Sequence, residues 1–194
     1  MTGRIERDPA YKRHAAAAFL ERYEQVQLGE QLSGYERDRA YRASLDTNIR
    51  RPAQFDLLDE RMLDRYDLAD LAAYLEPDRD ALFDYMDLET LEQRYFLSTE
   101  QDGERLELPQ TFWMRVAMGL ALEEDEPQRR AREFYDVLSK LEFTPSTPTL
   151  LHSGTAIPPA SVVLSDNRTE RSRPHFRVLQ APRHALEMER RARQ

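Results

Sequence analysis

The chain has no cysteine among its 194 residues. This absence excludes disulfides, thiolate metal sites and thiol catalysis by these residues. Glycine is also scarce, because only six glycines occur and none of them forms a Gly-rich phosphate loop. No apolar run approaches the roughly 20 residues that span a bilayer, and the N-terminus has no apolar signal core. We therefore expect a cytoplasmic protein without a membrane partner.

Positive charge is in deficit over most of the chain. The protein is 33% charged, with a formal net charge of −8 and a pI near 5.1, which argues against binding to a phosphate backbone. We expect no specific nucleic-acid partner. Residues 167–194 differ, because they contain eight arginines against three glutamates. We expect this basic, proline-interrupted tail to be disordered and divergent.

Helical periodicity dominates the first half of the chain. Residues 10–28 follow an Asp-Pro helix start, and Gly29 is a plausible stop. Their expected apolar stripe consists of Tyr11, Ala15, Ala18, Phe19, Arg22 and Val26. Residues 35–48 predict a second helix, whose apolar side carries Tyr35, Ala40, Tyr41 and Leu45 and which we expect to end before Pro52.

Shorter elements follow. Leucines and methionines recur at helical spacing over residues 57–75, and residues 78–85 predict one more short helix. We expect Asp87 to cap a helix over residues 88–95. Two short apolar runs then flank Asp102-Gly103, which predicts a small β-hairpin.

The most apolar helix is predicted over residues 109–122. Arg115 is the single charge inside it, and a helix that is apolar nearly all round is a buried, central one. Pro127 begins another predicted helix, over residues 128–141, which turns inward Ala131, Phe134, Tyr135, Leu138 and Leu141.

The stretch 145–166 differs in character from the helices before it. Pro148 is expected to push Thr147 toward an extended conformation. Ser153-Gly154-Thr155 offers hydroxyls and a residue that tolerates positive φ, which is typical of a tight turn near a ligand. The run 161–164 predicts a buried β-strand.

Candidate sites are few. The four histidines are scattered without metal-ligand spacing, so we expect no metal site, and the carboxylates are best explained as helix caps and solvated faces. The hydroxyls of residues 147–155 have two interpretations. They are turn and cap residues around prolines, or they bind phosphate or hydroxyl oxygens of a substrate.

The order of several motifs resembles one known family. The succession closely resembles the large (α) subunit of ribonucleotide reductase, in its N-terminal helical region and the entry to its ten-stranded barrel. The motifs are Leu-Glu-Gln-Arg-Tyr-Phe-Leu (91–97), the Asp-Gly hairpin, Leu-Pro-Gln-Thr-Phe-Trp-Met-Arg-Val-Ala-Met-Gly-Leu-Ala-Leu (108–122), Phe-Tyr-Asp-Val-Leu (134–138) and Ser-Thr-Pro-Thr-Leu-Leu-His-Ser-Gly-Thr (146–155).

The resemblance implies reduction of ribonucleotides to deoxyribonucleotides by a thiyl radical. It implies that Thr149 contacts the bound ribonucleotide, with Ser153 and Ser161 as weaker candidates. No catalytic residue is expected, because Val162 or Val163 stands where the family has a reducing cysteine on its first barrel strand. No cofactor is expected in this chain; the parent enzyme would need a radical generator, either a di-metal subunit or adenosylcobalamin.

We therefore expect a mainly α protein with a small hairpin and an incomplete first barrel strand. The expected division is a helical domain over 1–141, the start of the barrel over 142–166 and a divergent tail over 167–194. The chain would be a fragment of a ribonucleoside-diphosphate reductase α chain that is inactive alone, with the small subunit or a second large-subunit chain as partner. The alternative is a non-catalytic helical protein that binds or complements a reductase subunit. Because the barrel is incomplete, we also expect an exposed apolar patch that consists of Leu150, Leu151, Val162, Val163 and Leu164.

Overall fold

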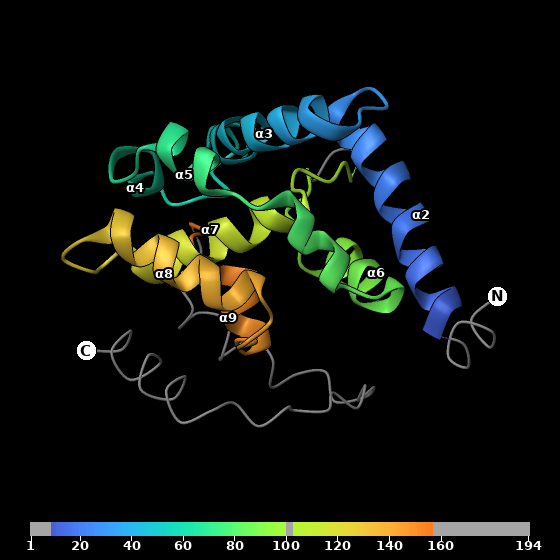
Figure 1. The fold of residues 1–194 in the computed structure, drawn as a ribbon. Coiled ribbons are helices and arrows are strands. Elements are labelled where there is room, and N and C mark those ends of the chain that lie inside the picture. Colours follow the sequence, from blue (N-terminus) through green and yellow to red (C-terminus); the bar gives the residue numbers. More distant parts are fainter. Residues whose placement is uncertain (1–8, 100–102, 157–194) are drawn as a thin grey trace.

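A computed structural model describes residues 9–99 and 103–156 of the chain. This part is mainly helical, as predicted, and α7 lies in its middle with α8 packed along it and α3 on the other side (Figure 1). The elements in chain order are α2 (Pro9–Leu28), α3 (Gly34–Gln54), α4 (Arg61–Asp64), α5 (Leu68–Tyr74), η1 (Pro77–Leu82), α6 (Tyr85–Arg94), α7 (Pro109–Ala121), α8 (Pro127–Ser139) and α9 (Thr147–His152).

Helix α2 has the predicted extent but a different buried stripe. It ends at Leu28 and is followed by Gly29, whose φ of +79° is readily adopted by glycine, as expected for a helix stop. Ala16, Phe19 and Tyr23 are its buried apolar residues, whereas the predicted stripe residues Tyr11 and Val26 are exposed. Phe19 is therefore buried as predicted, but most of the predicted stripe is misplaced, because alanines occur all round this helix and the pattern does not select one face.

Helix α3 continues through Pro52, where the sequence predicted its end. Proline lacks the N–H that would bond to the carbonyl four residues earlier, and its ring crowds that preceding turn. Pro52 is nevertheless inside the helix, and its ring is buried. The helix ends two residues later at Gln54, and Phe55 is its C-cap. Its buried face contains Tyr41, Leu45 and Ile49, spaced four residues apart. Tyr35, predicted on the apolar side, is 76% exposed.

The segment between α3 and α7 is broken into short elements. The apolar repeat over 57–75 forms α4 and α5, and the predicted helix over 78–85 is the 3₁₀ helix η1. Helix α6 begins at Tyr85, three residues earlier than predicted, because Asp84 is the N-cap. Asp87 is the reciprocal partner in a capping box, where its carboxylate accepts the Asp84 N–H.

The predicted hairpin after α6 is a short antiparallel contact. Ser98 and Arg105 form an isolated bridge, and the Leu106 N–H donates to the Leu97 carbonyl at 2.9 Å. Gly103 has a φ of +70°, consistent with its place in the turn.

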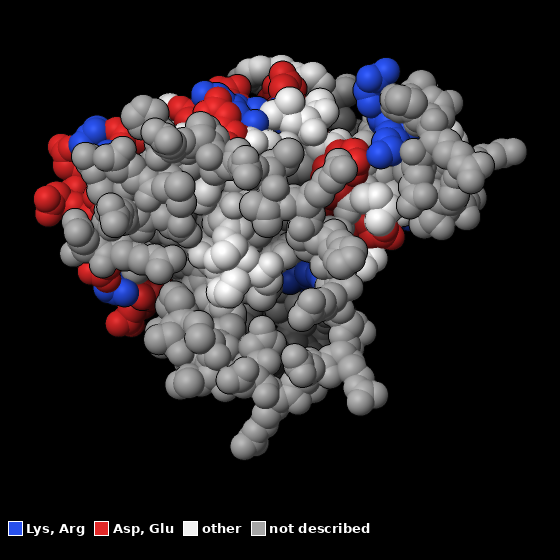
Figure 2. Space-filling model, turned by 90° about the horizontal axis from the view of Figure 1, so that it is seen from below, with Lys and Arg blue, Asp and Glu red and all other residues white. Residues whose placement is uncertain are grey.

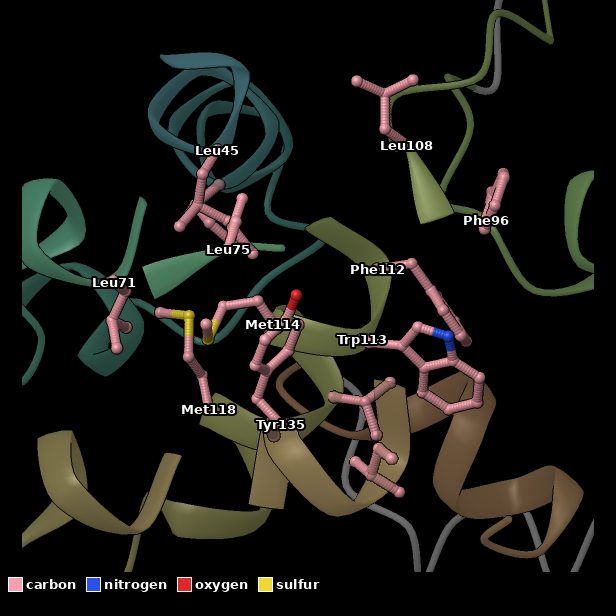
Figure 3. Close-up of a cluster of buried hydrophobic side chains, with 14 of the residues drawn as sticks. Leu45, Leu71, Leu75, Phe96, Leu108, Phe112, Trp113, Met114, Met118 and Tyr135 are labelled. Atoms are coloured by element: carbon pink, nitrogen blue, oxygen red, sulfur yellow. The ribbon is translucent and has the colours of Figure 1, made fainter. Parts of the chain in front are cut away.

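The core gathers around α7, as its composition predicted. Every residue from Pro109 to Met118 is buried, and apolar side chains from α3, α5 and α8 surround the helix (Figure 3). Helix α8 buries Ala131, Phe134, Tyr135 and Leu138 as predicted. Leu141 was predicted to face inward but is exposed, because it lies beyond the end of α8 with a φ of +58°.

A set of buried polar contacts connects η1 to the core. The Asp80 carboxylate is 1% exposed, and it accepts hydrogen bonds from the Tyr41 hydroxyl at 2.6 Å and from the Gln110 amide at 2.7 Å. Tyr135 donates to the Gln110 side-chain oxygen at 2.8 Å. This network thus joins α3, η1, α7 and α8 without an ion pair to Asp80.

The surface carries charges of both signs. On the face shown in Figure 2, the described acidic and basic side chains lie next to one another along the rim. Arg61 pairs with Glu123 at 2.5 Å, and Arg51 pairs with Glu104 at 2.6 Å. Within the described residues, none of the helices is long and apolar enough to cross a membrane.

Candidate functional site

Thr149 lies on α9, a helix of six residues that the sequence did not predict. Thr147, expected to be extended because it precedes Pro148, is the first helical residue. Proline is tolerated in a first helical turn, where its N–H would have no intrahelical partner. The extended residue is Ser146, and burial of Leu150 holds the helix against the core.

Hydroxyl groups gather at the start of α9. The Ser146 and Thr149 side-chain oxygens lie 3.1 Å apart, and the Thr147 oxygen lies 3.2 Å from the Tyr95 hydroxyl. Thr149 is half-buried, whereas Ser146 and Thr147 are exposed. A hydroxyl can both donate and accept, so this group suits a ligand rich in oxygen atoms.

The Ser153-Gly154-Thr155 turn follows α9, as the sequence predicted. Gly154 has a φ of +75°. The turn pairs with the chain before α4, because the Asp59 N–H donates to the Gly154 carbonyl at 3.1 Å and the Ala156 N–H donates to the Leu57 carbonyl at 3.2 Å. Two segments about a hundred residues apart in sequence therefore lie side by side.

Ser153 points into the protein. It is buried, and its hydroxyl donates to the Val116 carbonyl on α7 at 2.9 Å. Its N–H donates to the Thr149 carbonyl at 2.9 Å, so the two candidate residues bracket the last turn of α9. Ser161, the third candidate, lies outside the described residues, as does the predicted strand over 161–164.

Two residues of the predicted apolar patch, Leu150 and Leu151, lie within the described residues. Leu150 is 5% exposed and belongs to the core, and Leu151 is half-buried and packs against it. The expectation that Leu150 is exposed is therefore wrong, because α9 folds back onto the helical body. Val162, Val163 and Leu164 lie outside the described residues.

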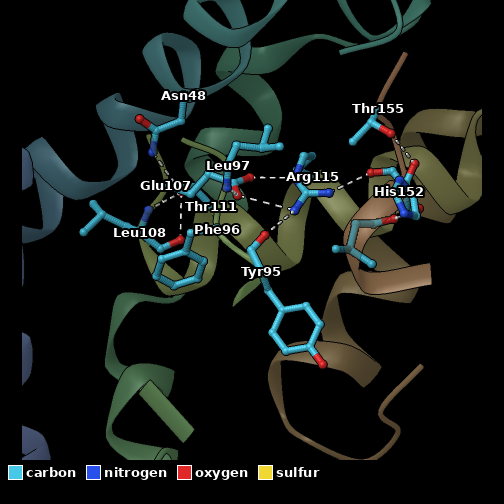
Figure 4. A network of polar contacts seen from close by, with 12 residues as sticks. Asn48, Tyr95, Phe96, Leu97, Glu107, Leu108, Thr111, Arg115, His152 and Thr155 are labelled. Carbon is cyan, nitrogen blue, oxygen red and sulfur yellow. Dashed lines mark hydrogen bonds and ion pairs between the residues drawn. The ribbon is translucent and has the colours of Figure 1, made fainter. Parts of the chain in front are cut away.

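A buried ion pair lies directly behind the turn (Figure 4). The Arg115 Nε donates to a Glu107 carboxylate oxygen at 2.6 Å, and both residues are 0% exposed. The Arg115 Nη1 donates to the Ser153 carbonyl at 2.8 Å. Glu107 also accepts the Leu97 N–H at 2.7 Å, and its carbonyl accepts the Tyr23 hydroxyl at 2.8 Å.

This pair was missed from the sequence, although a signal for half of it was present. Arg115 is the lone charge in an apolar helix, and a charge that is buried must be paired. Glu107 could not be selected from the many acidic residues, because its pairing with Arg115 depends on how the segment before α7 folds back.

The local electrostatics affect one further group. Burial and the positive charge of Arg115 lower the pKa of His152, which favours the neutral imidazole. The part of the chain that the structure describes contains no group of three His, Asp or Glu residues arranged to hold a metal ion.

Comparison with known proteins identifies the helical body. Residues 81–158 match the family model of the ribonucleotide reductase all-alpha domain. The ribonucleoside-diphosphate reductase subunit alpha of Chlamydia muridarum is 39% identical over 150 residues, which are 77% of this chain and 14% of that protein. The corresponding Helicobacter pylori protein is 42% identical over 92 residues, 47% of this chain and 12% of that protein.

A third relative also matches about half of this chain. The ribonucleoside-diphosphate reductase large subunit of Trypanosoma brucei brucei is 38% identical over 96 residues, which are 48% of this chain and 11% of that protein. The chain thus matches no more than about a seventh of the length of these relatives. The matched region contains α6 to α9, the buried pair of Glu107 with Arg115, and the turn behind Thr149. Residues 81–158 thus carry the all-alpha domain of ribonucleotide reductase, and the chain is similar over most of its length to large subunits of that family.

Proposed function

We propose that this chain acts as the helical domain of a ribonucleoside-diphosphate reductase α subunit. In this role it holds the segment around Thr149 against a ribonucleotide that a neighbouring catalytic domain reduces to a deoxyribonucleotide. Such an activity supplies precursors for DNA replication in the cytoplasm, and it makes a reductase small subunit or a second large-subunit chain the expected partner.

The observation that carries the proposal is the placement of α9. The family match extends through this helix, and the Thr149 hydroxyl lies half-buried at its start with the Ser146 hydroxyl 3.1 Å away. Behind it, the 153–155 turn is fixed on α7 by hydrogen bonds from Arg115 and Ser153. A hydroxyl on a rigid support suits recognition of the hydroxyl and phosphate oxygens of a nucleotide.

The chain contributes binding and support, and the redox step needs other residues. A thiyl radical and a reducing pair of thiols require cysteine, which is absent from these 194 residues. The described residues also have no cluster that fits a metal ion, so we assign no step of radical generation to them. We propose that both come from other polypeptide segments.

A domain exchange tests this function. The aligned 150 residues of this chain would replace their counterpart in the Chlamydia muridarum α subunit, and reduction of CDP would be measured with that enzyme's own radical-generating partner. We expect dCDP to form, because the exchanged domain presents the same segment to the nucleotide. A folded, correctly assembled exchange protein that forms no dCDP would contradict the proposal.

A further inference from the structure

Arg115 reaches two structures at once from the middle of α7. Its guanidinium donates to the Glu107 carboxylate at 2.6 Å on one side and to the Ser153 carbonyl at 2.8 Å on the other. A third, longer contact of 3.5 Å reaches the Tyr95 carbonyl. Glu107 neutralises the charge, and the remaining donors of the fork are then free to bind backbone oxygens of the turn.

The turn also fits α7 sterically. A Cβ added to Gly119 would lie 2.1 Å from the Gly154 nitrogen and 2.5 Å from the Ser153 carbonyl carbon, closer than real Cβ atoms come to backbone. A Cβ on Gly154 would lie 2.8 Å from the Met62 Cε. The backbone of the turn therefore lies directly on the helix at Gly119, and this position has no room for a side chain.

Arg115 is connected to Thr149 by a short series of bonds. The Ser153 carbonyl accepts from Arg115, and the Ser153 N–H donates to the Thr149 carbonyl at 2.9 Å. We propose that Arg115 is a positioning residue, which fixes the 153–155 turn on α7 and thereby the orientation of α9 and its Thr149 hydroxyl toward a ribonucleoside diphosphate. The nucleotide in this inference rests on the proposed function, whereas the support of the turn does not.

The geometry requires arginine specifically. A guanidinium presents donors in several fixed directions, while a lysine ammonium is a single point on a flexible stem. Lysine at this position could keep the ion pair with Glu107 but could not also reproduce the contact with the Ser153 carbonyl. Arg115→Lys therefore retains the buried charge balance and removes the support of the turn.

Amide hydrogen exchange in the full chain tests the support of the turn. In Arg115→Lys we expect roughly 10-fold or faster exchange at the N–H groups of Ser153 and Ala156, because a charge-assisted hydrogen bond is lost. Amides in the middle of α7 should keep their wild-type rates. Arg130→Lys on α8, whose arginine is partly exposed and paired with Glu133 at 2.7 Å, is the matched control and should change neither set.

Gly119→Ala is a second test, because its expected effect here is the opposite of the usual effect of this substitution in a helix. Alanine normally stabilises a helix interior relative to glycine. Here we expect faster exchange at Ser153 and Ala156, because the new Cβ displaces the turn from α7. Unchanged exchange at these amides in both variants, or equal acceleration throughout the core, would overturn the positioning role.

Titration of the full chain with CDP, followed by NMR, distinguishes nucleotide binding at Thr149 from the support of the turn by Arg115. We expect millimolar CDP to shift the Thr149 amide signal in the wild type, and Arg115→Lys, checked by urea unfolding to be folded under the same conditions, to bind CDP roughly 10-fold more weakly. If CDP shifts Thr149 equally in both proteins, the positioning inference is wrong. If the wild type shows no shift at Thr149 while the exchange results hold, the proposed nucleotide contact fails and the support of the turn stands.

Discussion

At the scale of single residues, the protein buries charged side chains in two different ways. Glu107 neutralises Arg115 in a fully buried ion pair, whereas Asp80 is held by the neutral donors Tyr41 and Gln110. The stability that a buried ion pair provides depends strongly on the presence of both partners. The stability of a protein with a buried carboxylate that lacks a cation depends on pH. These two solutions predict different responses to substitution.

Arg115→Met should destabilise the protein by about 3–5 kcal/mol, because it leaves the Glu107 charge buried and unpaired. The double variant Glu107→Gln/Arg115→Met should recover much of this loss, since the glutamine side chain is neutral and can still accept the Leu97 N–H. Urea unfolding of both single variants and the double variant gives the interaction energy. Additive losses would show that the pair is not coupled.

Asp80 predicts that stability falls as pH rises from about 4 to about 7. Burial raises the pKa of this carboxyl from 3.8 to about 7, although hydrogen bonds from Tyr41 and Gln110 favour the charged form and oppose this change. Because the folded-state pKa exceeds the unfolded one, the folded state binds the extra proton in this window. The free energy of unfolding should therefore lose about 1.4 kcal/mol per pH unit from this group.

Asp80→Asn isolates this contribution. Asparagine cannot ionise, so the difference in unfolding free energy between wild type and variant should change by on the order of 2–3 kcal/mol between pH 5 and pH 7. Nearby Arg37 and Glu24 are present in both proteins and cancel in this comparison. A constant difference across the range would mean that Asp80 stays ionised in the folded state.

At the scale of elements, helix ends define where the chain changes direction. The Asp84 carboxylate accepts the N–H groups of Met86 at 2.8 Å and Asp87 at 3.0 Å, which satisfies two free donors at the start of α6. The Asp87 carboxylate in turn accepts a hydrogen bond from the Asp84 N–H at 3.1 Å. This capping box starts the helix that packs against α2.

Asp84→Ala should therefore cost about 1 kcal/mol of unfolding free energy. Asp46→Ala on α3 is the control, since it removes only an exposed i,i+4 ion pair with Arg50 and should cost about 0.5 kcal/mol or less. Chemical denaturation of the two variants side by side measures both values. Equal losses would refute a special role for the cap.

The sequence predicted long elements better than local choices between neighbours. Proline or glycine bounds and apolar periodicity located α2, α7 and α8, because such signals are read within one helix. The cap of α6 was assigned to Asp87 instead of Asp84, since both residues are good N-caps three positions apart. Thr147 is helical against its local preference because Leu150 of the same helix is buried against the core. This packing is a tertiary effect, which local sequence signals do not contain.

At the scale of the whole molecule, the site combines distant segments. The 153–155 turn was predictable, because glycine between two hydroxyl residues is a local signal. Its contacts with Leu57, Asp59 and Arg115 were not, because they join positions 38 to about 100 residues apart. The family resemblance pointed to Thr149, and the structure adds the support behind it.

The chain alone should reduce no ribonucleotide, even with a radical-generating subunit present. The physical reason is the absence of cysteine, since no other side chain forms the thiyl radical or supplies the reducing thiols. Incubation of the purified chain with CDP, a reductant and a small subunit, followed by chromatography for dCDP, checks this. Formation of dCDP above the level without the chain would contradict it.

We propose that this helical domain presents Thr149 to the ribonucleotide. Steady-state CDP reduction by the domain-exchange protein, compared with its Thr149→Val and Thr149→Ser variants, measures this contact. We expect the exchange protein to form dCDP, Thr149→Val to raise the KM for CDP about 10-fold, and Thr149→Ser to keep it near the parent value, because serine retains the hydroxyl. An inactive exchange protein that folds and assembles, or an unchanged KM in Thr149→Val, would show that the domain does not present Thr149 to the nucleotide.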